Sequence, residues 1–133
     1  MAIADRHGLP VACSVASASP HETQLVETTI EQRFTRAKPK RMIGDAAYDS
    51  DPLDQHLREK HRIRLIAPHK SNRRRKKTQD GRELRRYCRR WKIERLFAWL
   101  HNFRRLVTRW EYNEANYLAM VQLGCLVILA RHL

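Results

Sequence analysis

Short apolar stretches separated by turn residues organise the first third of the chain. The stretches MAIA and LPVACSVASA flank the turn residues Asp5–Gly8, a pattern that predicts a β-hairpin with a short first arm. The following SPHE reads as a capping box, with Ser19 as N-cap and Glu22 reaching back to the backbone amide of Ser19. We therefore expect a helix from Pro20 to about Arg33.

The middle of the chain alternates short apolar runs with a capped helix. Met42 and Ile43 form a run that ends at Gly44 and predicts a strand, and RIRLIAP (residues 62–68) predicts another. Between them, Asp51 as N-cap predicts a helix over residues 52–60. The order strand, helix, strand, helix, strand, helix indicates an α/β fold with partly parallel strands.

Two longer helices are expected near the C-terminus, from about Arg82 to Val107 and from Asn113 to His132. With about 100° per residue, one face of the first is apolar and should pack on the sheet. That face comprises Ile93, Leu96, Phe97, Leu100 and Val107. The most apolar stretch, YLAMVQLGCLVILA, has about 14 residues, fewer than the roughly 20 that cross a bilayer, so it predicts a buried helix and no membrane partner.

The charge is strongly basic and unevenly placed, which narrows the expected class of partner. A formal net charge of +13 and a pI near 10.5 exceed what solubility requires. Sixteen Lys and Arg residues lie between Lys70 and Arg109, against three acids. This segregation predicts a polyanion-binding face, and nucleic acid is favoured over an anionic membrane surface. A length of 133 residues predicts one domain with one modest core.

The cysteines and the N-terminal residues indicate the cellular compartment in which the protein is expected. Cys13, Cys88 and Cys125 show no short-range pairing, which argues against a disulfide framework or a zinc knuckle and favours a reducing compartment. The first residues are charged and lack the apolar core of a secretory signal. We expect a cytoplasmic protein.

The segment HKSNRRRKKTQDG has two interpretations. It carries Lys70, Arg73, Arg74 and Arg75 and no apolar residue. It is either a flexible charged linker or a loop whose cations contact phosphates directly. The sequence leaves both open.

Glu94 is the only acid on an otherwise basic stretch, RRYCRRWKIERLFAWLHNFRR. On the predicted helix it shares an arc of roughly 60° with Tyr87, Arg90 and His101, beside the apolar face. It either pairs with Arg90, for about 0.3–0.5 kcal/mol, or acts as a metal-binding carboxylate next to a nucleic-acid groove. The second interpretation requires another carboxylate. Asp45 is the candidate, because it follows a predicted strand and ligands collect at the carboxyl ends of strands.

Four segments together resemble a known family. DRHGLPVA, ASPHE, GDAAYDS and YCRRWKIERLFAWLHNFRRLVTRWE are similar to the C-terminal part of bacterial insertion-sequence transposases of the DDE class. The most specific feature is the family signature of Tyr, Arg, Glu and Lys at fixed spacing. Tyr87, Arg90 and Glu94 match it, whereas His101 stands in place of Lys. A histidine there implies a weaker, pH-dependent phosphate contact.

The resemblance implies a truncated ribonuclease-H-like α/β fold, with a small mixed sheet flanked by helices and two long C-terminal helices. It implies that Asp45 and Glu94 are the second and third acids of a catalytic triad and bind magnesium or manganese, which suit oxygen ligands. The activity implied is metal-dependent phosphoryl transfer in DNA cleavage and strand transfer. The residues expected to contact DNA are Tyr87, Arg90, Lys92, Arg95, His101, Arg104 and Arg105.

The first acid of the family lies on a strand upstream of the hairpin. Asp5 resembles the turn residue of the hairpin and not that acid. Residues 1–133 are therefore expected to form a partial catalytic domain that lacks the first strand and first Asp, and whose activity needs the upstream transposase part or a full-length transposase. The alternative is a catalytically inactive, basic DNA-binding remnant, which predicts salt-dependent binding that does not need Glu94.

Overall fold

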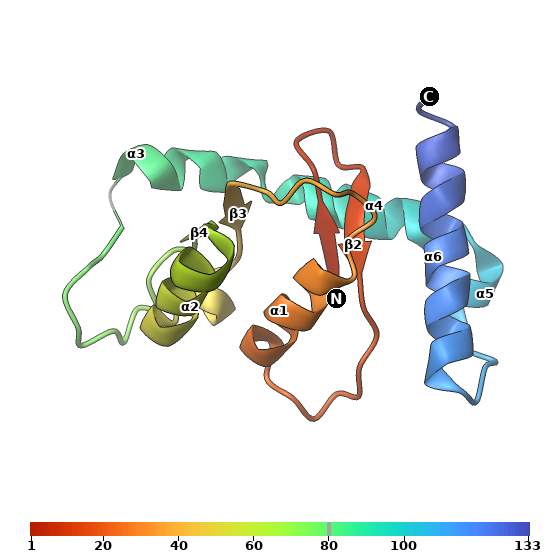
Figure 1. Ribbon diagram of the computed structural model, residues 1–133, viewed down its shortest axis with the longest axis horizontal. Coiled ribbons are helices and arrows are strands. Elements are labelled where there is room, and N and C mark those ends of the chain that lie inside the picture. The colour runs from red at the N-terminus through yellow and green to blue at the C-terminus, as the bar shows by residue number, and fades with distance from the viewer. Residues whose placement is uncertain (80) are drawn as a thin grey trace. The chain divides into compact units, whose positions relative to one another are not determined.

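The computed structural model describes residues 1–79 and 81–133, and their contacts divide the chain into two compact units. The first unit contains residues 1–35 and 91–133, and the second contains residues 36–90 (Figure 1). The α/β class predicted from the sequence is confirmed. The strands do not form one mixed sheet, however, because they pair two by two, one pair in each unit.

A β-hairpin opens the first unit, as predicted. Strands β1 (Ala2–Ala4) and β2 (Pro10–Cys13) pair antiparallel, with Ala2 opposite Cys13. The Asp5 carboxylate accepts hydrogen bonds from the amides of His7 (2.7 Å) and Leu9 (2.9 Å), which closes the turn. Gly8 completes it with φ of 81°, a conformation that favours glycine.

Helix α1 (Glu22–Glu31) begins later than the capping box predicts. Its N-cap is His21, whose Nδ1 accepts a hydrogen bond from the Thr23 amide at 3.3 Å. The prediction of Ser19 as N-cap is therefore wrong. Farther along the helix, the hydroxyl of Thr29 lies 2.6 Å from the hydroxyl of Ser14, so a buried polar pair joins the helix to the chain that follows β2.

The core of the first unit is built from the hairpin, α4 (Trp91–Leu100), α5 (Arg104–Val107) and α6 (Glu114–Ala130). Its buried members are Cys13, Leu96, Leu100, Leu106, Cys125 and Ile128. Helix α6 starts as predicted, because the Asn113 side chain caps it by accepting from the Ala115 amide at 2.8 Å. Within residues 1–79 and 81–133, no helix combines the length and apolar character needed to cross a bilayer.

The predicted helix from Arg82 to Val107 is wrong. The chain instead forms α3 (Gly81–Leu84), the 3-10 helix η2 (Arg85–Arg89), α4 and α5. Six residues separate Leu100 from Leu106, so an unbroken helix would point them about 120° apart. The break between α4 and α5 brings both into the core and leaves Val107, predicted to be buried, 61% exposed.

The second unit contains a parallel strand pair with its crossover helix. Strands β3 (Arg41–Ile43) and β4 (Arg64–Ile66) pair in parallel, and α2 (Asp51–His61) connects them. The parallel pairing is as expected. The N-cap of α2 is Ser50 and not Asp51. The buried apolar residues are Leu57, Ile63, Leu65, Ile66 and Ala67.

Candidate catalytic carboxylates and basic surfaces

Asp45 lies at the carboxyl end of β3, where it caps the 3-10 helix η1 (Ala46–Tyr48). Its Oδ1 accepts a hydrogen bond from the Ala47 amide at 2.8 Å. The preceding Gly44 is packed against Tyr48, whose ring carbon Cδ2 would lie 2.8 Å from an added Cβ. Within the described part of the chain, Oδ2 of Asp45 has no protein partner. The carboxylate is thus oriented by the backbone through one oxygen, and the other remains available to a ligand.

Glu94 lies in the first turn of α4 and is exposed. It belongs to the first unit, whereas Asp45 belongs to the second. The joint metal site of these two acids therefore stays a prediction from the sequence. The chemistry of the donors suits magnesium or manganese, since each acid offers carboxylate oxygens, the ligands that these ions prefer.

Tyr87 and Arg90 share the second unit, and the structure brings them together. The guanidinium of Arg90 lies 5.7 Å from the centre of the Tyr87 ring, within the range of a cation–π contact. Tyr87 is half-buried on η2 and Arg90 is exposed directly after it. Two of the three signature residues are thus in contact.

Two of the cations predicted to contact DNA bond the hairpin turn. Lys92 Nζ donates a hydrogen bond to the carbonyl of Arg6, and Arg95 Nη2 donates to the carbonyl of His7. Helix α4 is therefore tied to the hairpin by two charge-assisted hydrogen bonds. These contacts give Lys92 and Arg95 a structural role that residue spacing alone does not reveal.

The side chain of Arg95 is also enclosed by aromatic rings. Its guanidinium carbon lies 5.0 Å from the Trp91 ring centre and 4.9 Å from that of Trp99. These tryptophans are four residues before and after Arg95, so they occupy the same face of α4. A Cβ at Gly8 would lie 2.7 Å from Arg95 Nη2. A side chain at Gly8 would thus meet the end of the Arg95 side chain, in addition to the unfavourable φ.

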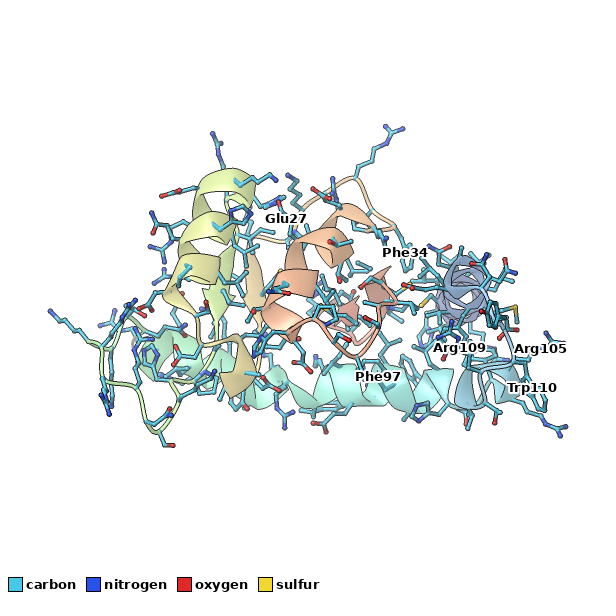
Figure 2. The ribbon with its side chains drawn as sticks, turned by 90° about the horizontal axis from the view of Figure 1, so that it is seen from below. Glu27, Phe34, Phe97, Arg105, Arg109 and Trp110 are labelled. Carbon is cyan, nitrogen blue, oxygen red and sulfur yellow. The ribbon has the colours of Figure 1, made fainter. Side chains whose placement is uncertain are left out.

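The remaining predicted DNA contacts of the first unit surround α5. His101 and Arg104 are exposed, and Arg105 is 67% exposed while it pairs with Glu111 at 3.3 Å. Figure 2 shows Arg105 close to Arg109 and Trp110, and Trp110 is 76% exposed. This end of the unit presents cations and an exposed indole, the combination that binds phosphates and stacks on bases.

Acids of the second unit bind two arginines of its basic loop, Arg73 and Arg75. Arg73 is only 10% exposed and donates to Asp49 at 2.9 Å and to Asp51 at 2.6 Å. Arg75 is 77% exposed and lies 3.5 Å from Asp51. Lys70 and Arg74 are exposed. Of the predicted contacts in this loop, Arg73 is thus occupied by protein carboxylates.

Asp49 is the centre of these contacts. Its buried carboxylate accepts from His69 Nδ1 (2.8 Å), the Lys70 amide (2.8 Å) and Arg73 Nη1 (2.9 Å). Burial alone would raise the pKa of Asp49, but these hydrogen bonds and the charge of Arg73 hold that pKa below its usual range. A hydrogen bond from Arg73 likewise lowers the pKa of Asp51.

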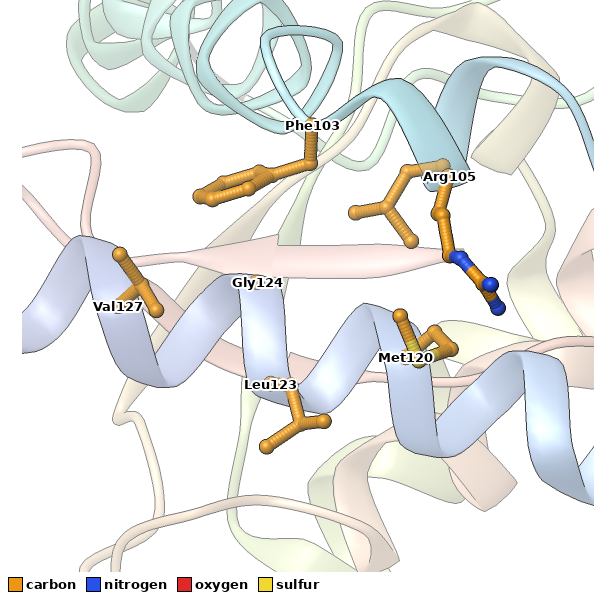
Figure 3. A pocket seen from close by; sticks show the side chains of 7 residues that line it. Phe103, Arg105, Met120, Leu123, Gly124 and Val127 are labelled. Atoms are coloured by element: carbon orange, nitrogen blue, oxygen red, sulfur yellow. The ribbon is translucent and has the colours of Figure 1, made fainter.

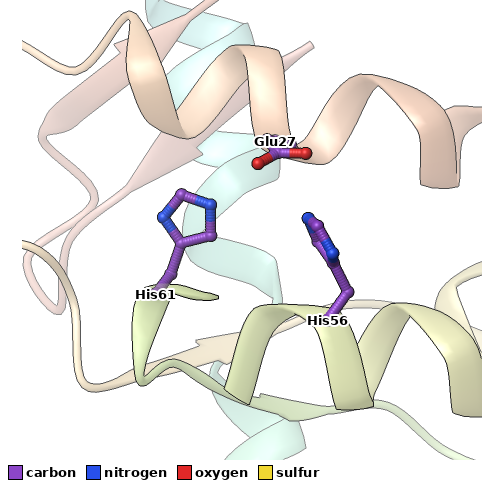
Figure 4. A group of neighbouring side chains, drawn as sticks. All are labelled: Glu27, His56 and His61. Carbon is purple, nitrogen blue, oxygen red and sulfur yellow. The ribbon is translucent and has the colours of Figure 1, made fainter. Parts of the chain in front are cut away.

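His56 and His61 lie on α2, with ring centres 6.2 Å apart (Figure 4). His61 is buried, and its Nδ1 is 3.2 Å from Lys38 Nζ. A lysine ammonium can only donate, so Nδ1 accepts. His61 thus has a structural contact within the second unit.

A small apolar hollow lies between α5 and α6, with a volume near 110 Å³. The ring of Phe103 lies over Gly124, where an added Cβ would be 3.4 Å from it (Figure 3). Met120, Leu123 and Val127 complete the apolar wall. The hollow contains no acid, so it is not a candidate metal site.

Comparison with known proteins gives a consistent assignment. The family model described as "Transposase DDE domain" matches residues 1–129. A protein of Burkholderia cepacia described as "Putative transposase for insertion sequence element IS402" is 31% identical over 134 residues, which cover 95% of this chain and 59% of that protein. No solved structure matches. The chain therefore belongs to the family of insertion-sequence transposases with a DDE domain.

Proposed function

We propose that the chain is the C-terminal part of a DNA transposase that cleaves and joins DNA by metal-dependent phosphoryl transfer, with Asp45 and Glu94 as catalytic carboxylates. The observation that carries the proposal is the position of Asp45. It stands at the end of a parallel strand, its carboxylate is fixed by the Ala47 amide, and its other oxygen has no protein partner in the described residues. The family match over residues 1–129 supports the same assignment.

Magnesium or manganese bound to these acids would activate the attacking hydroxyl group and stabilise the leaving oxygen. The residues of this chain have three tasks in that reaction. Asp45 and Glu94 provide oxygen ligands, Arg90 and Tyr87 hold the DNA strand, and the cations around α5 bind the phosphate backbone. His101 joins them as a contact that strengthens on protonation, because a neutral imidazole has no charge to attract phosphate.

We propose further that catalysis requires a third carboxylate from a longer or separate transposase polypeptide. The match spans 59% of the length of the Burkholderia cepacia relative, so a full-length transposase has additional segments that can supply it. The partners are thus DNA and that polypeptide.

A strand-transfer assay tests the catalytic roles. The chain would be combined with the polypeptide encoded beside it and with DNA that flanks its gene, in magnesium. We expect Asp45→Asn and Glu94→Gln each to lower the rate by more than about 100-fold. Glu31→Gln, an exposed acid at the end of α1, serves as the matched control and should keep the rate. Full activity in either carboxylate variant would show that the assignment is wrong.

A second candidate function is DNA binding without catalysis. The net charge of +13 and the exposed cations around α5 favour it independently of the acids. It predicts steeply salt-dependent binding that Glu94→Gln leaves unchanged or strengthens, together with no metal-dependent product under any condition of the assay.

A further inference from the structure

An arginine occupies a left-handed position at the end of α2. Arg62 is the C-cap of this helix, with φ of 56° and ψ of 31°. It is the only residue other than glycine with positive φ in the described ranges, 1–79 and 81–133. Helices commonly end on glycine at such a position, because a side chain disfavours this conformation. Residues with a strained backbone are often found at functional sites, so the surroundings of the Arg62 side chain are relevant.

Arg62 lines a solvent-accessible hollow with a volume of about 510 Å³ in the second unit. The other lining residues are Arg58, Ile63 and Arg64, and Ile63 is fully buried. Three arginines therefore line one concave surface with an apolar residue in its wall. This surface is separate in sequence from every cation that the sequence analysis assigns to DNA.

The three arginines differ in how their charge is balanced. Arg58 pairs with Asp54 at 2.9 Å, and Arg64 pairs with Glu83 at 2.7 Å. Both remain more than half exposed, at 62% and 52%. For Arg62, the described part of the chain provides no side-chain partner. Two cations are thus held by carboxylates that leave further N–H donors open, and the third carries an uncompensated charge.

We propose that this hollow, defined by Arg58, Arg62 and Arg64, binds a phosphate of the DNA backbone. Guanidinium groups suit this ligand, because their N–H donors match the spacing of phosphate oxygens. The hollow gives non-sequence-specific affinity and positions the duplex on the second unit, which also carries Asp45. The inference rests on the proposed function in one respect only, that DNA is the substrate.

Substitution of Arg62 by glycine tests this site without an expected loss of stability. Arg62→Gly removes the guanidinium and relieves the left-handed strain, so the variant should fold at least as well as the natural chain. Arg131→Gly is the matched control, since Arg131 is the exposed C-cap of α6 with an ordinary φ of −76°. Both variants lose one positive charge. Arg62→Asn is a second test variant, because Asn tolerates the left-handed conformation.

The measurement is the dissociation constant for a random-sequence DNA duplex between 50 and 200 mM salt, values that span the usual range of counterion effects. We expect Arg62→Gly and Arg62→Asn to bind about three- to tenfold more weakly, with a salt slope lower by about 0.9. Arg131→Gly should match the natural chain.

Equal affinities and slopes for Arg62→Gly and Arg131→Gly would overturn the proposal. The proposed function fails separately, if the natural chain does not bind duplex DNA at the lowest salt concentration. Absence of strand transfer leaves this binding test intact, because no catalysis enters it.

Discussion

Leu106 and Val107 provide a sharp test of the break between α4 and α5. A continuous helix puts Val107 on the apolar face, whereas the structure buries Leu106 at 9% exposure and leaves Val107 at 61%. Replacing each with alanine separates the two arrangements. The two starting residues differ in helix propensity, which contributes less than about 0.7 kcal/mol to the difference between the two substitutions.

The expected cost follows from the contacts of Leu106. A buried Leu→Ala substitution costs about 2–5 kcal/mol, and the lower end applies here because the side chain borders an existing apolar hollow. We expect about 2–3 kcal/mol for Leu106→Ala and less than about 0.5 kcal/mol for Val107→Ala. In a chain of this size, the first corresponds to a fall in Tm of about 8–12 °C.

Urea unfolding followed by circular dichroism measures both free energies of unfolding in the same buffer. Leu118→Ala, on α6, is a positive control for core truncation because Leu118 packs against the core cluster. A cost for Val107→Ala that equals or exceeds the cost for Leu106→Ala would refute the break and restore the continuous helix.

Three further results are expected. Gly8→Ala should lower the free energy of unfolding by about 1–2 kcal/mol, because alanine disfavours the left-handed φ. Thermal unfolding measures this loss, and Gly8→Asn should show a smaller one because Asn tolerates this conformation. Ser50→Ala should cost about 1 kcal/mol through loss of the N-cap of α2, measured by urea unfolding against Ser71→Ala, which lies in the loop. The lowered pKa of Asp49 means that its stabilisation is complete above its unfolded pKa near 4 and is lost as pH falls through the folded pKa. Urea titrations from neutral to acidic pH should show this loss in the natural chain and a smaller one in Asp49→Asn; equal acid sensitivity would contradict the role of Asp49.

The sequence alone predicts the features that a few neighbouring residues encode. The hairpin turn follows from Asp5 and Gly8, because an aspartate that bonds nearby amides and a glycine with positive φ suffice to reverse the chain. The start of α6 follows from Asn113, and the position of Asp45 at the end of β3 follows from a short apolar run that ends in glycine. The proposal that Asp45 and Glu94 are catalytic carboxylates likewise depends on such local patterns and on the family resemblance.

The predicted helix starts are wrong where two neighbouring residues can each act as N-cap. Ser19 and His21 can both cap α1, and Asp51 and Ser50 can both cap α2, so the sequence identifies each helix but misplaces its first residue. The only sign of the strained C-cap at Arg62 in the sequence is that neither glycine nor asparagine stands at the end of the predicted helix. This sign can be recognised only when the last residue of the helix is known.

Only the tertiary structure decides which charged side chains are free. Lys92 and Arg95 look like solvent-facing cations in the sequence, but they bond carbonyl groups of a turn 86 and 88 residues away. Arg73 likewise pairs with acids 24 and 22 residues away. Helical periodicity also misplaces Val107, because burying both Leu100 and Leu106 requires a break that no local residue demands. Local hydrogen bonds set where turns and caps form, whereas packing between segments that are distant in sequence sets which side chains remain exposed.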